Sequence, residues 1–137
     1  MASYSDNSIS YWNLTTRTER LFSTGHTDNV NCLKVLSFDT MASGGADNRI
    51  FIWNLTTFNS IRSINPAHST DVLSLEQTPQ GYLVSSSAGP DGEIKIWHPN
   101  NGSLFFSLPN PYPSVDVDCL RMINNTHLAA GMQRGTY

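Results

Sequence analysis

Three tryptophans divide the chain of 137 residues into units of similar length. Trp12, Trp53 and Trp97 are 41 and 44 residues apart, and each ends a short alternating run: SISYW, RIFIW and EIKIW. Six residues before each tryptophan stands an aspartate: Asp6, Asp47 and Asp91. Self-similarity at a fixed period indicates a repeat architecture, in which each unit buries its apolar face against its neighbours. We therefore expect a row of similar units.

The residues between the tryptophans form short β-patterned segments. A histidine precedes the second and third tryptophan, His26 in TGHTDNVNCL and His68 in PAHSTDVLSL, and a β-patterned run follows each. The run RIFIWNL alternates with period two, and an Asp-Asn turn joins it to TMASGGA, which indicates a hairpin. Seven prolines punctuate the loops, and no stretch has a convincing helical period. The pattern predicts an all-β chain of four-stranded antiparallel units.

This combination of features resembles the WD40 repeat, which has a period of about 42 residues, a histidine after Gly or Ala, a turn aspartate and a tryptophan at a strand end. The resemblance covers the whole chain, and GHTDNVNCL with MASGGADNRIFIWNL is its most specific part. Asn replaces the signature Asp after Trp12 and Trp53. His98 follows Trp97, and Pro113 lies where the fourth histidine would fall. The resemblance implies a β-propeller, whose blades surround a central channel.

The repeat pattern implies one incomplete propeller domain over residues 1–137, an arc of about three blades. It divides into a partial blade (1–25), two blades (26–66 and 67–109) and a second partial blade (110–137). The first partial blade would hold second, third and outer strands, and the last would hold an inner strand, a second strand and the start of a third. Either the chain is a piece of a longer propeller, or a homodimer completes the ring. We favour the first, because the surplus strand at 127–133 would compete with residues 1–5 in a dimer.

One constellation resembles a catalytic site. His26, Ser43 and Asp47 are the residue types of an acyl-transfer triad. In WD40 proteins the same set, together with Trp53, forms a structural hydrogen-bond tetrad. A buried indole N–H needs a partner, and serine, histidine and aspartate can continue the chain of bonds. A nucleophile would also need an exposed pocket and an oxyanion hole, which nothing in the sequence indicates. We therefore expect a protein-protein interaction scaffold and no enzyme, with a hydrolase or a purely structural assembly subunit as the alternatives.

The same set recurs in part elsewhere in the chain. In the next blade its members would be His68, Asp91, Trp97 and either Ser85 or Ser87, of which we select Ser85. The insertion AGP lengthens the turn before Asp91 and makes the choice of serine ambiguous. The first unit offers Asp6 and Trp12 to a tetrad but has no histidine. Repetition favours a structural device, since an enzyme rarely needs one site per repeat.

The resemblance also implies positions that contact a partner. They lie three and five residues after the repeat histidine and one before the turn aspartate. Carried over by position, they are Asn29, Asn31, Ala46, Asp71, Leu73, Pro90, Asp116, Asp118 and Gln133. Four aspartates would make this rim acidic: Asp28, Asp71, Asp116 and Asp118. An acidic rim favours a basic protein or peptide segment, although Asp is also an ordinary residue of turns.

Composition excludes several other classes of function. The net charge of −3 gives no general attraction to nucleic acid or to an anionic membrane. No apolar run reaches the length of about 18 residues that a membrane span needs, and the first residues do not resemble a signal peptide. The two cysteines fit free thiols in a reducing compartment, so we expect a cytoplasmic or nuclear protein that is not secreted. The histidines show no paired ligand spacing, and we expect neither a metal nor a cofactor.

Overall fold

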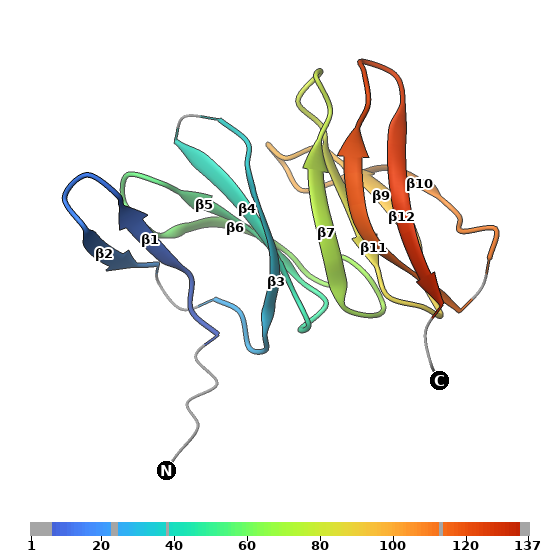
Figure 1. The fold of residues 1–137 in the computed structure, drawn as a ribbon, viewed down its shortest axis with the longest axis horizontal. Helices are drawn as coiled ribbons and strands as arrows, with labels where there is room; N and C mark the ends of the chain where they lie inside the picture. The colour runs from blue at the N-terminus through green and yellow to red at the C-terminus, as the bar shows by residue number, and fades with distance from the viewer. Residues whose placement is uncertain (1–6, 23–24, 38, 113, 135–137) are drawn as a thin grey trace, which may run out of the picture.

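The computed structural model describes residues 7–22, 25–37, 39–112 and 114–134. All regular secondary structure in this part of the chain is β-strand, in twelve strands that form four antiparallel sheets (Figure 1). None of the described segments forms a helix long and apolar enough to span a membrane. The predicted fold class is therefore confirmed: an all-β arc of antiparallel sheets that does not close on itself.

Two complete sheets of four strands lie in the middle of the row. The second blade consists of β3 (Val30–Val35), β4 (Thr40–Gly45), β5 (Ile50–Asn54) and β6 (Ser60–Ile64). The third blade consists of β7 (Val72–Gln77), β8 (Leu83–Ser87), β9 (Ile94–Trp97) and β10 (Leu104–Leu108). In both blades, strands that follow one another in the chain are neighbours in the sheet. Such a meander needs only short connections, which the turn residues of each repeat supply.

A two-stranded sheet flanks the two blades on each side. The first unit holds β1 (Ser10–Asn13) and β2 (Thr18–Leu21), and the fourth unit holds β11 (Val115–Met122) and β12 (Leu128–Arg134). These pairs are the expected third and outer strands of the first unit and the expected inner and second strands of the fourth. The expected second strand at residues 1–5 and the start of a third strand after residue 134 lie outside the described residues.

The apolar cores lie between neighbouring sheets. Ile9 and Phe22 of the first unit pack with Trp53 of the second blade. A larger core joins the second and third blades, and there Val72 and Leu83 are completely buried. A third core joins the third blade to β11 and β12. Since full burial of one such side chain contributes about 1.5–3 kcal/mol, each sheet depends on its neighbours for stability.

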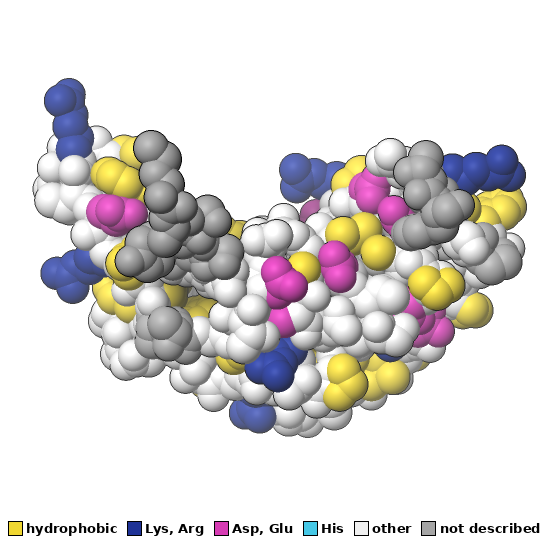
Figure 2. All heavy atoms as spheres, turned by 90° about the horizontal axis from the view of Figure 1, so that it is seen from below, with side chains coloured by type: hydrophobic (Ala, Val, Ile, Leu, Met, Phe, Trp, Pro, Cys, Tyr) yellow, Lys and Arg dark blue, Asp and Glu magenta, His cyan; other side chains and the backbone are white. Residues whose placement is uncertain are grey.

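The inner strands β3, β7 and β11 stand side by side along the arc (Figure 1). The molecule is crescent-shaped and is hollowed on one side (Figure 2). Cys32, Ser74 and Cys119 occupy equivalent register positions on these strands, opposite Gly44, Ser86 and Gly131. Both cysteines are free thiols, as expected from the sequence. The inner strands therefore share one register, so that each residue of one inner strand has an equivalent residue on the other two.

Candidate functional site

The second blade holds a chain of hydrogen bonds that connects its hairpin turn to its third strand. His26 Nδ1 lies 3.0 Å from each carboxylate oxygen of Asp47. On the other side of the ring, His26 Nε2 lies 2.6 Å from Ser43 Oγ. The indole Nε1 of Trp53 donates to the same hydroxyl oxygen at 2.8 Å. The structure thus brings together the four residues that the sequence grouped, from the loop before β3 and from β4, β5 and the turn between them.

One arrangement of protons satisfies every member of this chain. An indole N–H can only donate, so Ser43 Oγ accepts from Trp53. The Ser43 hydroxyl then donates to His26 Nε2, and the Nδ1–H of His26 donates to Asp47. The serine side chain is completely buried, and the histidine side chain is buried as well. The chain therefore satisfies polar groups that would each cost about 1–3 kcal/mol if left unpaired in the interior.

Backbone contacts fix both ends of the chain. The carboxylate of Asp47 also accepts from the backbone N–H groups of Thr27, at 2.9 Å, and Arg49, at 3.2 Å. The indole of Trp53 lies beside Gly25, where a Cβ atom would come within 2.7 Å of the ring. Phe22 of the first unit meets the same indole edge-on, with 5.6 Å between ring centroids. Gly25 thus leaves space for the indole of Trp53, and His26 supplies the hydrogen-bond partner of Ser43.

The third blade repeats this chain with one link missing. Trp97 Nε1 donates to Ser85 Oγ at 2.8 Å, and His68 Nε2 lies 2.8 Å from the same oxygen. His68 Nδ1, however, is 3.8 Å from Asp91 Oδ2 and has no hydrogen-bond partner among the described residues. The backbone N–H of Ser69 donates to Asp91 at 3.0 Å instead. Ser85 and not Ser87 is thus the serine that joins tryptophan and histidine.

The electrostatics of His68 follow from this geometry. The pKa of His68 is lowered from 6.5 to about 4, mainly by burial and also by the positive charge of Lys95, while the negative charge of Asp91 opposes the shift. Burial works in the opposite direction on Asp91, but hydrogen bonds from Ser69 and the charge of Lys95 bring the pKa of that carboxyl below its usual value. The imidazole is therefore uncharged near neutral pH and acts as an acceptor for the Ser85 hydroxyl.

Trp12 does not belong to such a chain, contrary to the sequence-based assignment. Its side chain is 55% exposed, and its Nε1 donates to Ser10 Oγ at 3.1 Å on the surface. Asp6, the expected partner, lies outside the described residues. The physical reason is the lack of a neighbour: Trp53 is covered by Phe22 of the preceding unit, whereas no described element covers the outer side of the first unit.

The predicted partner-contact positions lie where the inner strands begin and the second-to-third hairpins turn, on the face seen in Figure 2. Asn29, Asn31, Pro90, Asp118 and Gln133 are exposed. The other four are half-buried: Ala46, Asp71, Leu73 and Asp116.

Two of these polar residues already have contacts within the protein. The side-chain amide of Asn31 donates to the backbone carbonyl of Val72 in the next blade at 3.1 Å. Asp116 accepts from the backbone N–H of Gly89 at 2.6 Å. Both bonds link neighbouring sheets, so Asn31 and Asp116 contribute to the junctions of the arc as well as to its rim.

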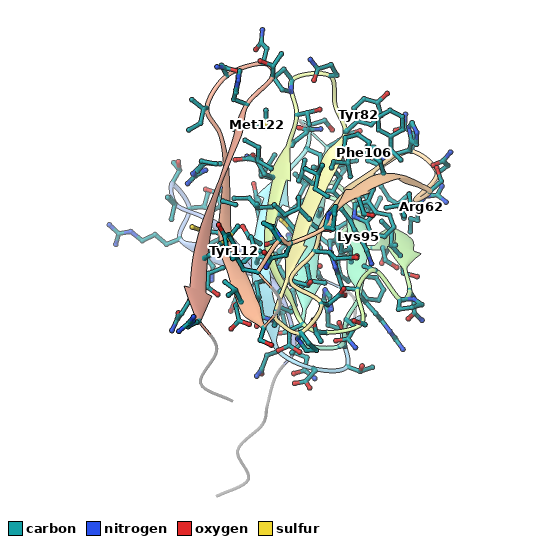
Figure 3. The ribbon with its side chains drawn as sticks, turned by 90° about the vertical axis from the view of Figure 1, so that its right-hand side faces the viewer. Arg62, Tyr82, Lys95, Phe106, Tyr112 and Met122 are labelled. Atoms are coloured by element: carbon teal, nitrogen blue, oxygen red, sulfur yellow. The ribbon has the colours of Figure 1, made fainter. Side chains whose placement is uncertain are left out.

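The opposite face carries a hollow between the second and third blades. It has a volume of about 680 Å³, and Ile52, Arg62, Tyr82 and His98 are among its lining residues. Tyr82 and Arg62 are marked in Figure 3. The guanidinium of Arg62 donates to the backbone carbonyl of Asn101 at 3.3 Å, so its position is determined by the neighbouring blade. No three His, Cys, Asp or Glu side chains of the described residues gather as they would around a metal ion.

A row of charges on the inner strands was missed by the sequence reasoning. Lys34 of β3 and Arg121 of β11 both approach the buried carboxylate of Glu76 on β7. The signal was present in the sequence, because the three residues each lie two positions after Cys32, Ser74 and Cys119. What the sequence does not reveal is the spacing of the blades, which brings the three side chains within reach of one another.

Comparison with known proteins agrees with this geometry. The family model "WD domain, G-beta repeat" matches residues 18–54 and 58–98, more than half of the chain. The U3 small nucleolar RNA-associated protein 15 homolog of Gallus gallus is 27% identical over 130 residues, which are 93% of this chain and 24% of that protein. The methylosome protein WDR77 of Xenopus laevis is 37% identical over 73 residues, 53% of this chain and 22% of that protein. The chain thus spans about a quarter of the length of these relatives.

A solved structure shows the same fold. The crystal structure of the WD40 β-propeller domain of Doa1 superimposes with a TM-score of 0.79 at 23% sequence identity. The match covers 96% of this chain and 45% of the Doa1 chain. Taken with the family model and the repeated Trp–Ser–His chain, this shows that the protein belongs to the WD40 repeat family and folds as part of a WD40 β-propeller.

Proposed function

We propose that the chain is a non-catalytic interaction module that presents the face seen in Figure 2 to a basic segment of a partner protein. The observation that carries this proposal is the set of aspartates at the beginnings of the inner strands. Asp28 and Asp118 are exposed there, and Asp71 and Asp116 are half-buried. Figure 2 shows acidic side chains in the middle, at the right and at the left of this face, with Lys and Arg at its upper edges and also below the central acidic group. Complementary charge favours Arg- or Lys-containing segments.

The geometry around Ser43 supports a scaffold over a hydrolase. The hydroxyl is completely buried and is already engaged by Trp53 and His26. A nucleophile must reach a substrate carbonyl, with donors placed for the oxyanion. A second copy of the arrangement at Ser85 is equally buried. Both sets satisfy the indole N–H groups between blades, which is a structural task.

The relatives support interaction in general and no particular partner. One is named for association with the U3 small nucleolar RNA, another for the methylosome, and a third is the protein transport protein Sec31A of Danio rerio. These names indicate different assemblies, so none is transferred to this chain. We keep the cytoplasm or nucleus as the proposed compartment and expect neither nucleic acid nor membrane as a direct ligand. A longer propeller remains our preferred context, with a homodimer as the alternative.

The proposal is tested with a fluorescent peptide of alternating arginine and serine. We expect the double variant Asp71→Asn/Asp118→Asn to bind this peptide about fivefold more weakly at low salt, because two charges near the peptide are removed. The control Glu19→Gln/Asp39→Asn removes the same net charge elsewhere on the chain and should change the affinity by less than about twofold. Fluorescence anisotropy measures both.

Each other outcome contradicts the proposal. Equal weakening by the two variants would mean that the peptide responds only to net charge. Unchanged binding by the Asp71/Asp118 variant would mean that the acidic rim is not the site. Circular dichroism spectra that match the wild type establish that either variant is folded.

A further inference from the structure

A bulge in the outer strand of the second blade turns two neighbouring side chains toward the hollow between the second and third blades. In the register of β5 and β6, Arg62 stands opposite Ile52. Ser60 stands opposite the next residue of β5, so Ile61 has no Cα partner on that strand. Neighbours in a regular strand point to opposite faces, but Ile61 and Arg62 both line the hollow. One strand thus supplies it with an aliphatic side chain and a cation.

The third blade has the same bulge with different residues. In the register of β9 and β10, Phe105 is the extra residue. Phe106, which follows it, therefore holds the position that Arg62 holds in the second blade. Since the repeat accommodates an apolar side chain there, strand pairing does not require a cation at this position. The arginine is a specific feature of the junction between the two blades.

The guanidinium of Arg62 is fixed in place but has no counter-charge. It donates to the backbone carbonyl of Asn101 at 3.3 Å, and a Cβ atom on Gly102 would come within 3.1 Å of its Cδ atom. Arg62 takes part in none of the ion pairs between described residues. It is also the only Lys, Arg, Asp or Glu among the described residues that line the hollow. The nearby Asp39 accepts from the hydroxyl of the lining residue Ser37 at 2.8 Å. A guanidinium has five N–H donors, so this one can still bind a carboxylate.

The opposite wall of the hollow is a cluster of three rings. Tyr82 stacks on Phe105, with 4.8 Å between the ring centroids and an interplanar angle of 5°. His98 meets both rings edge-on at 5.1 Å. Tyr82 and His98 line the hollow, and each ring limits the movement of the other two. Such a wall offers apolar contact area at a small cost in side-chain entropy.

We propose that this hollow binds an extended acidic segment of a partner protein, in which aliphatic side chains flank a glutamate or aspartate. The carboxylate pairs with Arg62, and the aliphatic side chains contact Ile61 and Tyr82 (Figure 3). The side-chain amides of Gln77 and Asn100 also line the hollow, where main-chain groups of a peptide can meet them. The volume of about 680 Å³ lies in the usual range for ligand sites.

Charge complementarity defines this occupant. The hollow lies on the face opposite the acidic rim and favours the opposite charge, so the inference does not depend on the proposed function. Both walls belong to the two four-stranded blades.

Two peptides test the requirement for a carboxylate. They are Gly-Leu-Glu-Leu-Gly and Gly-Leu-Gln-Leu-Gly, each amidated and carrying an uncharged fluorophore at its N-terminus, so that only the glutamate is charged. At low salt, fluorescence anisotropy should show the wild type binding the glutamate peptide at least about fivefold more tightly. Arg62→Gln should abolish this preference. Arg62→Lys should retain part of it, because lysine supplies the charge without the planar fork.

Three further variants separate the contributions. Arg134→Gln makes the same change in net charge at the exposed end of β12 and should keep the preference for the glutamate peptide. Ile61→Ser should weaken the binding of both peptides by a similar factor of about three, because it removes apolar contact without changing charge. The rim variant Asp71→Asn/Asp118→Asn should bind the glutamate peptide within about twofold of the wild type.

The proposal is overturned if the wild type binds the two peptides equally, or if folded Arg62→Gln still distinguishes them as Arg134→Gln does. Light scattering covers one other occupant. Self-association of the wild type that Arg62→Gln abolishes would assign the hollow to a second copy of the chain and would also overturn the proposal. Circular dichroism spectra that match the wild type establish that each variant is folded.

Discussion

The second and third blades are built on one plan, but only the second completes its polar chain. In both blades an indole and an imidazole converge on a serine hydroxyl, at distances of 2.6–2.8 Å. In the second blade the imidazole continues to Asp47 at 3.0 Å. In the third blade the ring nitrogen of His68 is 3.8 Å from Asp91 and has no partner among the described residues.

Turn length and one substitution explain the difference. Four residues, 46–49, connect β4 to β5, whereas six, 88–93, connect β8 to β9. The longer turn leaves Asp91 bonded to the backbone and out of reach of the imidazole. Phe51 meets the ring of His26 edge-on at 4.7 Å, but Lys95 occupies the equivalent register position in the third blade. The Trp–Ser–His part therefore follows strand register, while the aspartate link depends on the turn.

The largest effect is expected from the link that the two blades share. Ser43→Ala and Ser85→Ala should each lower the free energy of unfolding by about 1–3 kcal/mol, because both leave a buried indole N–H without an acceptor. Urea denaturation measures the loss, with the exposed Ser63→Ala as the control. A large loss of stability in one variant and none in the other would show that the Trp–Ser–His hydrogen bonds do not contribute equally in the two blades. A folded Ser43→Ala chain that loses a measured hydrolase activity would overturn the non-catalytic assignment.

Acid should act on the third blade through His68. Its pKa is about 4 in the folded state and 6.5 without the shift, so between these values the unfolded state binds the extra proton. The stability present above pH 6.5 is therefore lost as the pH falls toward 4, with a slope on the order of 1.4 kcal/mol per pH unit. Urea denaturation across this window should show that His68→Gln removes this part of the slope. The exposed His127→Gln should retain it, and equal slopes in the wild type and His68→Gln would contradict the prediction.

The smallest effect is the difference between the two aspartates. Asp47→Ala should cost about 1 kcal/mol more than Asp91→Ala, because only Asp47 bonds the imidazole as well as the backbone. Thermal and urea denaturation of the two variants give the comparison. If Asp91→Ala were the more costly change, a contact of Asp91 other than the one to His68 would have to dominate.

The sequence predicted the features that depend on the spacing of the repeats and missed those that depend on contacts between neighbouring blades. The spacing of the tryptophans was sufficient to predict an all-β arc of four-stranded sheets. The same spacing placed His26, Ser43 and Asp47 around Trp53, as the structure does. It did not by itself separate Ser85, which we selected, from Ser87, because the inserted residues hide the register of β8 against β9. That choice requires the pairing of Ser85 with Lys95.

Trp12 and the inner-strand charges illustrate the other limit. Trp12 has the local context of Trp53, yet it is exposed because no described sheet covers its outer side. Glu76 is separated in the chain from Lys34 and Arg121 by a whole repeat each, and a period alone does not say which side chains reach across a junction. Burial and ion pairing between repeats therefore had to come from the structure.

The two cysteines hold equivalent positions in the arc but differ in chemical reactivity. Burial raises the pKa of the Cys32 thiol to about 12, with a hydrogen bond to Gly44 opposing the shift, so this sulfur is a poor nucleophile. Cys119 holds the same register position but is exposed, because no described strand packs on the side of β11 that faces away from β7. A thiol reagent would thus modify the exposed Cys119 faster than the half-buried Cys32, and protection of Cys119 would report whatever covers this side of β11.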